Sequence, residues 1–198
     1  MSNLTNQTDN NSGRNYMDPI KKLVEEHRTI LAVLNSFTSF AEVIRKNESC
    51  DNKKLGNYVR FIQQYADKYH HAKEEDILFE AMVEHGFSKQ IGPVAMMLHE
   101  HVEGRKYVKF LHEASLEQRE LTAPERQAVV NAICGYAELL RNHIYKEDNI
   151  LYPMASQQLP QVAYISMSDK FNLEEIRRLE LGEVVEMETL ANELISVN

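Results

Sequence analysis

Tryptophan is absent from this chain of 198 residues, and cysteine, proline and glycine are scarce, with 2, 5 and 7 copies. Because glycine and proline interrupt regular elements, their scarcity leaves long uninterrupted stretches and favours helices. The two cysteines, Cys50 and Cys134, form no CxxC or other recognised spacing, so no disulfide framework is indicated. We therefore expect a reducing, cytoplasmic setting.

Long apolar runs and excess positive charge are also missing. No apolar run approaches the ~18 residues that span a bilayer, and the polar N-terminus lacks the apolar core of a signal peptide. The net charge of −8 argues against nucleic acid or an anionic membrane surface as a partner. An apolar content of 43% and a charged content of 26% are ordinary for a soluble globular protein.

A short phrase occurs twice in the chain, about seventy residues apart. HHAKEEDILF begins at His70 and HIYKEDNILY begins at His143, and both fit H-x-x-K-E-[ED]-x-I-L-[FY]. Residues i and i+4 share one face of a helix, so each copy presents an imidazole and a carboxylate in the same direction. These pairs are His70 with Glu74 and His143 with Glu147. Two such pairs in one small protein indicate a metal site.

Hydrophobic periodicity predicts four long helices, at about 18–46, 54–84, 92–118 and 123–155. Asp18 followed by a proline is typical of a helix start, as is the capping-box spacing of Thr122 and Glu125. Gly86 suits a helix end. Residues 1–16 are rich in Asn, Ser and Thr and are expected to be disordered.

Four long helices joined by short loops predict an all-α fold, an antiparallel up-down-up-down four-helix bundle over residues 17–158. Residues 159–198 form a C-terminal extension with one further amphipathic helix, which we expect to pack on the bundle. The alternative is a surface for a homodimer or another partner. The apolar stripe of this helix comprises Leu173, Ile176, Leu179, Val184, Met187, Leu190 and Leu194.

Helical geometry separates the two histidines at positions 70 and 71. His70 shares its stripe with mostly apolar residues, so His70 and Glu74 are expected to face the core. His71 shares its stripe with polar residues, so His71 and Glu75 are expected to face solvent. The repeat agrees, because it aligns the first histidine of each copy.

The other two helices each carry one histidine on an apolar stripe, namely His27 and His101, with His101 favoured over His99. At ~1.5 Å per residue, one histidine from each helix falls at the same depth in an antiparallel bundle, ~14–21 Å from one pole. The predicted metal ligands are His27, His70, Glu74, His101, His143 and Glu147.

Two buried carboxylates require a cationic partner, and no inward Lys or Arg is an evident partner for both. Imidazoles and carboxylates together suit iron, manganese or zinc. Six ligands exceed the four of a tetrahedral zinc site, and carboxylates can bridge, so we expect a centre of two metal ions, iron before manganese or zinc. The alternative is a metal-free bundle with buried His–Glu hydrogen bonds.

This constellation resembles the hemerythrin-like family, also called HHE cation-binding domains, and in particular its bacterial branch, over about residues 18–157. The matching motifs are Glu26-His27-Arg28, His70-x3-Glu74, Glu100-His101-x-x-Gly104-Arg105, and His143-x3-Glu147 followed by Ile150-Leu151-Tyr152-Pro153. The resemblance implies a four-helix bundle with a non-haem di-iron centre, held by the six residues above, with carboxylate and oxo or hydroxo bridges.

The chain also departs from the family pattern. Oxygen-carrying hemerythrins have H-x3-H in the third helix, where this chain has Arg105 four residues after His101. They use H-x4-D in the fourth helix, so Asp148 competes with Glu147, although the i+4 geometry and the repeat favour Glu147. With four histidines rather than five, we expect the metals to have open positions.

The resemblance implies a cytoplasmic di-iron protein that binds or reacts with O2, peroxide or NO, in handling or sensing these molecules. The alternative is a regulatory iron- or oxygen-responsive module, or an iron-donating protein, without catalytic turnover. In the regulatory case the C-terminal helix contacts a partner, for which a second copy of the chain is one candidate. The sequence leaves open whether the protein is an enzyme.

Overall fold

The computed structural model describes residues 17–196, so the segment predicted to be disordered lies outside the described residues. Within that range the regular elements are helices and no strand occurs, which confirms the prediction of an all-α chain. None of the described helices is both long enough and apolar enough to cross a membrane.

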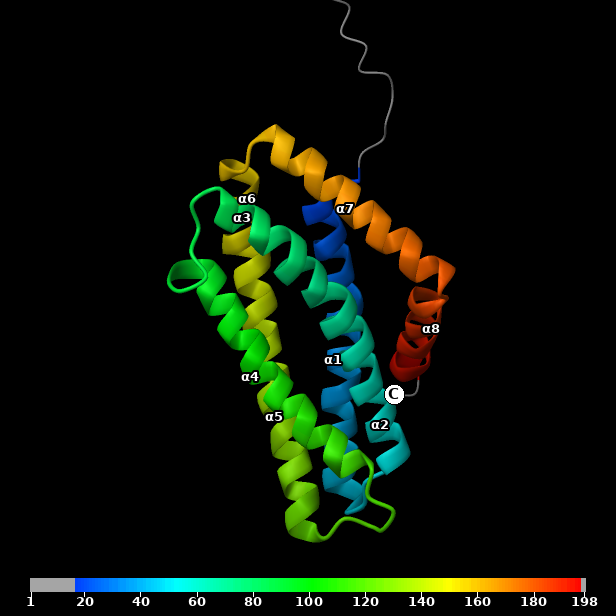
Figure 1. The fold of residues 1–198 in the computed structure, drawn as a ribbon. Helices are drawn as coiled ribbons and strands as arrows, with labels where there is room; N and C mark the ends of the chain where they lie inside the picture. Colours follow the sequence, from blue (N-terminus) through cyan, green and yellow to red (C-terminus); the bar gives the residue numbers. More distant parts are fainter. Residues whose placement is uncertain (1–16, 197–198) are drawn as a thin grey trace, which may run out of the picture.

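Four long helical segments lie side by side, and successive segments run in opposite directions (Figure 1). The first is α1 (Pro19–Asn47), and the third is α4 (Gly92–Ser115). The second comprises α2 (Asn52–Phe61), η1 (Ile62–His71), η2 (Glu74–Leu78) and α3 (Phe79–Glu84). The fourth comprises α5 (Ala123–Lys146), η3 (Glu147–Leu151) and α6 (Tyr152–Gln158).

The predicted helix boundaries are set by local hydrogen bonds. The Asp18 carboxylate accepts from the backbone N–H of Ile20 at 3.0 Å and so caps α1. The capping box before α5 is present, because the N–H of Thr122 donates to Glu125 at 2.7 Å. Gly86, with φ +100°, follows the end of α3. The two helix starts and the helix end predicted from these residues are therefore confirmed.

The second and fourth segments widen into a π-helix at the repeated phrase. The segments η2 and η3 occupy the same five positions of the two copies, beginning at Glu74 and Glu147. The N–H of Phe79 bonds to the carbonyl of Glu74, and the N–H of Tyr152 bonds to that of Glu147, five residues back in each case. π-helical turns inside α-helices are frequently found at functional sites. The repeat in sequence is therefore also a repeat in local structure.

The apolar core consists of two clusters with a polar layer between them. The larger cluster contains Phe37 and Ile133, and the smaller contains Leu23 and Tyr152. On each of the four segments, the site histidine lies between residues of the larger cluster and residues of the smaller one. The four segments thus deliver their histidines to one depth, as their sequence positions predict.

The C-terminal extension forms two helices, α7 (Gln161–Glu180) and α8 (Glu183–Ser196), rather than one. Figure 1 shows α7 running obliquely downward from the α6 end of the molecule and α8 continuing downward beside α2; α8 contacts α1 and α2. The predicted stripe is buried in α8 but not in α7, where Leu173 is 68% exposed. The turn at Gly182, with φ +73°, separates α7 from α8, so the two helices do not share one continuous apolar stripe. The buried face of α7 contains Met167 and Phe171 instead. The domain boundary at 158/159 stays a prediction.

Candidate metal centre

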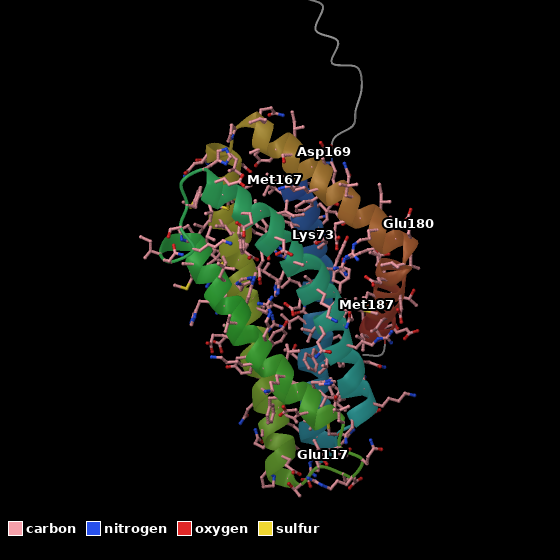
Figure 2. The ribbon with its side chains drawn as sticks, in the orientation of Figure 1. Lys73, Glu117, Met167, Asp169, Glu180 and Met187 are labelled. Atoms are coloured by element: carbon pink, nitrogen blue, oxygen red, sulfur yellow. The ribbon has the colours of Figure 1, made fainter. Side chains whose placement is uncertain are left out.

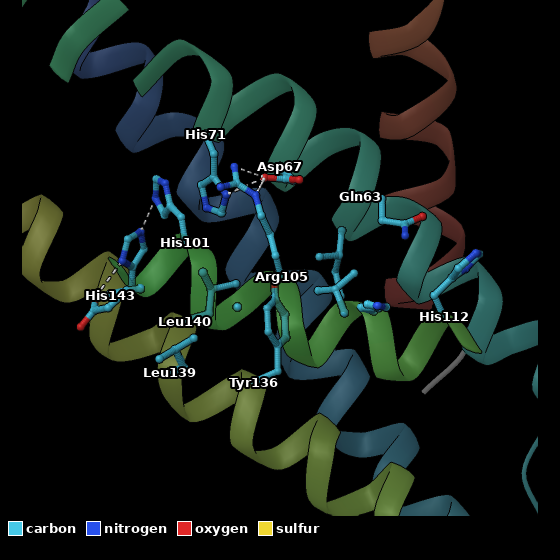
Figure 3. Close-up of a pocket in the computed structure, with 15 residues that line it drawn as sticks. Gln63, Asp67, His71, His101, Arg105, His112, Tyr136, Leu139, Leu140 and His143 are labelled. Atoms are coloured by element: carbon cyan, nitrogen blue, oxygen red, sulfur yellow. Dashed lines mark hydrogen bonds and ion pairs between the residues drawn. The ribbon is translucent and has the colours of Figure 1, made fainter. Parts of the chain in front are cut away.

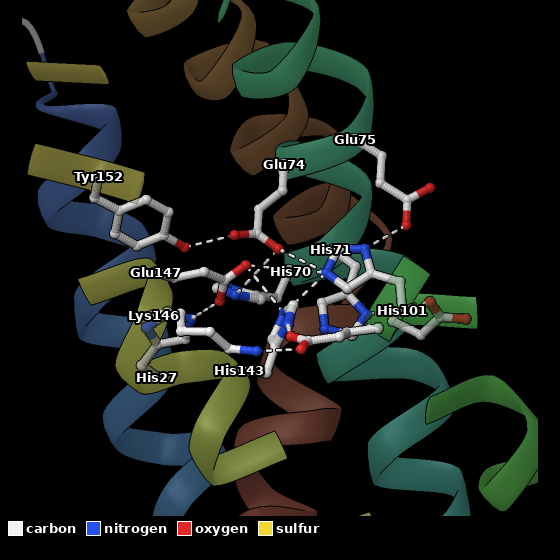
Figure 4. Close-up of polar contacts among 12 residues, drawn as sticks. His27, His70, His71, Glu74, Glu75, His101, His143, Lys146, Glu147 and Tyr152 are labelled. Carbon is white, nitrogen blue, oxygen red and sulfur yellow. Dashed lines mark hydrogen bonds and ion pairs between the residues drawn. The ribbon is translucent and has the colours of Figure 1, made fainter. Parts of the chain in front are cut away.

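All six predicted ligands lie in one buried layer, and none of them is more than 2% exposed (Figure 4). Potential ligand atoms in this layer form two groups, in each of which all atoms lie within 4.8 Å of one another. The first group is His27, His70, Glu74 and Glu147, and the second is His71, Glu74, His101 and His143. Glu74 belongs to both groups, so the arrangement offers two adjacent positions for a cation.

The prediction that His71 faces solvent is wrong. His71 is 7% exposed, and its ring stacks on that of His101 with 3.9 Å between centroids. His71 ends the π-helical segment η1, and a π-helix has more residues per turn than an α-helix. Consecutive side chains are then separated by a smaller angle, so His70 and His71 both face the interior. The buried layer therefore contains a fifth histidine, which the α-helical period had assigned to the surface.

Glu147 lies between the two groups of histidines. Its Oε1 is 3.0 Å from Nε2 of His143, and its Oε2 is 3.3 Å from Nε2 of His27. Asp148, the competing carboxylate, faces the outer side of His27 instead, where its Oδ1 is 2.8 Å from Nδ1. The inward carboxylate of the fourth segment is therefore Glu147.

Glu74 occupies the corresponding place on the second segment. Its Oε2 is 3.7 Å from Nε2 of His70 and 3.5 Å from Nε2 of His101. Its Oε1 accepts a hydrogen bond from the Tyr152 hydroxyl at 2.6 Å. Each of the two buried carboxylates thus lies between histidines of different groups, a position from which a carboxylate can bridge two ions.

Every histidine of the layer has a carboxylate at its outer nitrogen. The Nδ1 distances are 2.8 Å for His27–Asp148, 2.9 Å for His70–Glu26, 3.4 Å for His71–Asp67, 2.7 Å for His101–Glu75 and 2.9 Å for His143–Glu100. Because an ionised carboxylate only accepts, it keeps a proton on Nδ1, and Nε2 is then the atom that can direct a lone pair inward to a metal ion when the ring is neutral. This is the arrangement of carboxylate, histidine and metal that orients ligands in known sites. Glu75, predicted to face solvent, belongs to it.

The two copies of the repeated phrase make equivalent contacts, which gives the layer a pseudo-two-fold arrangement. His70 and Lys73 of the first copy both donate to Glu26, while His143 and Lys146 of the second both donate to Glu100. The next residue of each phrase contacts the other half of the centre. Glu75 of the first copy accepts from His101, which follows Glu100, and Asp148 of the second copy accepts from His27, which follows Glu26. Each half of the centre is therefore assembled from parts of both halves of the sequence.

The inward atoms of this layer lack partners that a cation would supply. Within residues 17–196, five of them have no hydrogen-bond partner: Nε2 of His27 and of His70, Oε2 of Glu74, and both carboxylate oxygens of Glu147. Nε2 of His101 and Nε2 of His143 lie only 3.0 Å apart, so two lone pairs face each other unless a proton or a metal ion intervenes. These donors therefore fit metal ions.

The charges of the layer lead to the same conclusion. Burial by itself lowers the pKa of His27, but its hydrogen bond to Asp148 and the nearby Glu147 raise it to about 9. Burial also lowers the pKa of His143, while the charge of Glu147 contributes to raising it to about 10. Burial and the charge of Glu147 raise the pKa of Glu74 well above its usual range. The two buried carboxylates thus favour positive charge beside them, which a metal ion can supply.

A pocket of about 210 Å³ connects this layer with the surface (Figure 3). Its inner end is lined by His71, His101 and His143, and Tyr136 forms part of its wall. Its outer part reaches the exposed His112 on α4. The pocket gives ions and small molecules a route to the centre.

Arg105 lines the same pocket and holds two outer carboxylates. Its Nε donates to Asp67 at 2.9 Å, and one terminal nitrogen donates to Glu75 at 2.7 Å. These carboxylates are the Nδ1 partners of His71 and His101. Arg105 occupies the position of the second histidine of H-x3-H. It therefore supports two histidines indirectly, through the carboxylates at their Nδ1 atoms.

Comparison with known proteins places this chain in a family. Residues 18–155 match the model of the hemerythrin HHE cation binding domain. Uncharacterized proteins of Mycobacterium bovis and of two strains of Mycobacterium tuberculosis are 20% identical over 156 residues, which are 79% of this chain and 60% of each relative. The chain thus spans 60% of the length of these relatives, and no solved structure matches it. The match over most of the chain shows that it belongs to the hemerythrin HHE cation-binding domain family, whose members bind metal, typically iron.

Proposed function

We propose that this chain is a non-haem di-iron protein of the hemerythrin type that binds or reacts with O2, peroxide or NO. The four long segments would form its up-down-up-down bundle, and Glu74 and Glu147 would bridge two iron ions. The observation that carries the proposal is the pair of overlapping ligand groups that share Glu74. Five histidines, each oriented by a carboxylate at Nδ1, support it.

The two groups offer different numbers of histidines. His71, His101 and His143 belong to one group, whereas only His27 and His70 belong to the other. An ion in the second group has fewer protein donors and therefore more room for a small exogenous ligand. When bound, a pair of iron ions supplies reversible ligand binding and one- or two-electron redox chemistry.

Residues beside the two-histidine group restrict what can enter. Leu23, four residues before His27 on α1, is fully buried in the smaller apolar cluster. The Tyr152 ring lies parallel to the His27 ring with 5.7 Å between centroids. Its hydroxyl donates to Glu74 and fixes the orientation of that carboxylate. Such tight apolar packing favours diatomic molecules and peroxide over larger ligands.

The burial of His71 changes the expected balance between binding and turnover. Five histidines leave fewer open metal positions than the four read from the sequence. We therefore expect binding of a single small ligand rather than reaction at two open positions. A regulatory module remains the second candidate, because the ion-pair network around Lys73 connects the centre to α7.

Metal analysis of the full-length protein, purified from iron-supplied cells, tests the proposal. We expect about two iron ions per chain and an absorption spectrum that changes on exposure to O2. A variant carrying Glu74→Ala and Glu147→Ala should lose the iron, whereas His99→Ala should keep it, because His99 is exposed on α4. Less than one metal ion per chain, unchanged in the double variant, would refute the di-iron centre.

A further inference from the structure

Lys73 is a fully buried lysine on the helical segment beside α7 (Figure 2). Its ammonium donates to Glu26 and, at 2.9 Å, to Glu175, and it lies 3.5 Å from the centre of the Tyr69 ring. Glu175 belongs to α7, outside residues 18–155 that match the family. A residue of the C-terminal extension thus supplies half of the negative charge around Lys73.

A continuous series of contacts runs from Glu175 to the metal centre. Lys73 binds one carboxylate oxygen of Glu26, and the other oxygen accepts from Nδ1 of His70 at 2.9 Å. Glu26 is therefore shared by Lys73 and His70. Glu175 determines how much of the charge of Lys73 is already neutralised, and so how strongly Lys73 competes for Glu26.

The other contacts of Glu175 keep it ionised and in place. It accepts from the Tyr69 hydroxyl at 2.5 Å and lies 3.1 Å from Nζ of Lys22. Burial would raise the pKa of Glu175, but the charge of Lys73 and the bond from Tyr69 lower it. α7 is thus attached to the bundle by an ionised, largely buried side chain.

The second copy of the repeated phrase lacks this connection. Lys146 donates to Glu100, which binds Nδ1 of His143, as Lys73 and Glu26 do for His70. The Lys146 side chain, however, is 31% exposed and has no second carboxylate in the described part of the chain. The two Lys–Glu–His series are therefore equivalent except that the series of Lys73 also contains Glu175.

We propose that Glu175 is a positioning residue for the half of the centre that contains His27 and His70, and that metal binding there and the packing of α7 stabilise each other. This inference rests on the proposed metal binding. By neutralising Lys73, Glu175 leaves Glu26 free to polarise His70, and a stronger Nδ1–H bond makes Nε2 a better metal donor. Linkage is reciprocal, so bound metal must favour the seated position of α7 to the same degree.

The first test compares Glu175→Gln with Glu180→Gln in the full-length protein. Both changes remove one negative charge from α7, but Glu180 is exposed at its end and away from Lys73 (Figure 2). Fe(II) is titrated anaerobically in competition with a chromogenic chelator. Because direct histidine partners typically contribute 10–100-fold to metal affinity, we expect a loss of about 3–10-fold from this more distant residue. The loss should affect one of the two ions, with a changed absorption spectrum, and the control should match the unaltered protein.

The second test needs no substitution. Hydrogen exchange of the α7 amides is measured in the unaltered protein with and without Fe(II), and residues 123–132 of α5 serve as the reference. We expect iron to slow exchange in α7 more than in the reference segment, and this difference to disappear in Glu175→Gln.

Two results would overturn the inference even if two iron ions bind: equal affinities of the two variants, or equal slowing in α7 and the reference. If Glu175→Gln fails to fold, the exchange measurement on the unaltered protein decides. If the unaltered protein binds no iron, it is the proposed function that fails.

Discussion

The repeated phrase provides a stability experiment with its own control, because Lys73 and Lys146 occupy equivalent positions in different surroundings. We expect Lys73→Met to destabilise the metal-free protein far more than Lys146→Met. Met retains most of the side-chain length and removes the ammonium group, with its charge and its hydrogen bonds. The comparison therefore isolates the effect of burying the ion pairs.

The magnitudes follow from burial. Lys73 is 1% exposed, and its partners Glu26 and Glu175 are 2% and 8% exposed. Removing one member of a buried ion pair typically costs ~3–5 kcal/mol, because the remaining charge is left without compensation. Lys22 still lies 3.1 Å from Glu175, so we expect the lower end of that range, about 3 kcal/mol. For the partly exposed Lys146, screening by solvent limits the loss to about 0–1 kcal/mol.

Urea denaturation of both variants, followed by far-UV circular dichroism with a chelator present, measures the difference. With a slope of about 2 kcal/mol per molar urea, the midpoint of Lys73→Met should fall by about 1.5 M. The midpoint of Lys146→Met should fall by less than about 0.5 M. A Lys73→Met/Glu175→Gln double variant should recover part of the loss, because it removes one of the two uncompensated charges.

Equal midpoints for the two single variants would refute the reasoning. They would mean that the ammonium of Lys73 is hydrated in solution, and that its contacts with Glu26 and Glu175 contribute no more than a surface pair. A double variant less stable than Lys73→Met would contradict the assignment of the loss to buried charge.

Three further predictions concern other parts of the chain. His71→Ala should weaken iron binding by about 10–100-fold in a chelator competition, because His71 is buried among the other ligands. His99→Ala should leave the affinity unchanged, because His99 is exposed. Equal iron affinities of the two variants would show that His71 is not a metal ligand. Burial and the neighbouring Asp51 raise the pKa of the Cys50 thiol to about 11, so its alkylation, mapped by mass spectrometry, should stay slow until the pH approaches 11. Because the folded pKa is raised, this thiol's contribution to stability is present below its ordinary pKa and is lost as the pH rises to 11. If α7 pairs two copies of the chain, Leu173→Lys should lower the mass measured by light scattering, and an unchanged mass would exclude that face.

The sequence was sufficient for the features that depend on regular geometry. The α-helical period and the caps located the long helices, and the positions of His27 and His101 placed them at the depth of the repeated phrase. Each of these inferences requires only that the rise and the rotation per residue stay constant along an α-helix. They held because α1, α4 and α5 keep the α-helical period up to the metal centre.

The errors arose where that period changes. His71 was assigned to the wrong face because η1 turns by a smaller angle per residue, and no local signal in the phrase marks the change. Leu173 was assigned to the wrong face because the turn at Gly182 separates two helices with different phases. Lys73 was missed for another reason. Its partner Glu175 lies about one hundred residues away, and such pairing is not encoded in any short pattern.

The repeated phrase by itself would build a symmetric centre, in which a small ligand has no reason to prefer either metal ion. Two residues break that symmetry. His71, which aligns with Ile144 in the second copy, adds a donor to the group containing His101 and leaves the His70 side with fewer donors. Glu175 acts on that same side, through Lys73 and Glu26. In the proposed di-iron protein, the half with room for an exogenous ligand is therefore the half that contacts α7. A change in charge on ligand binding would alter the strength of the His70–Glu26 bond and, through it, the packing of the C-terminal extension.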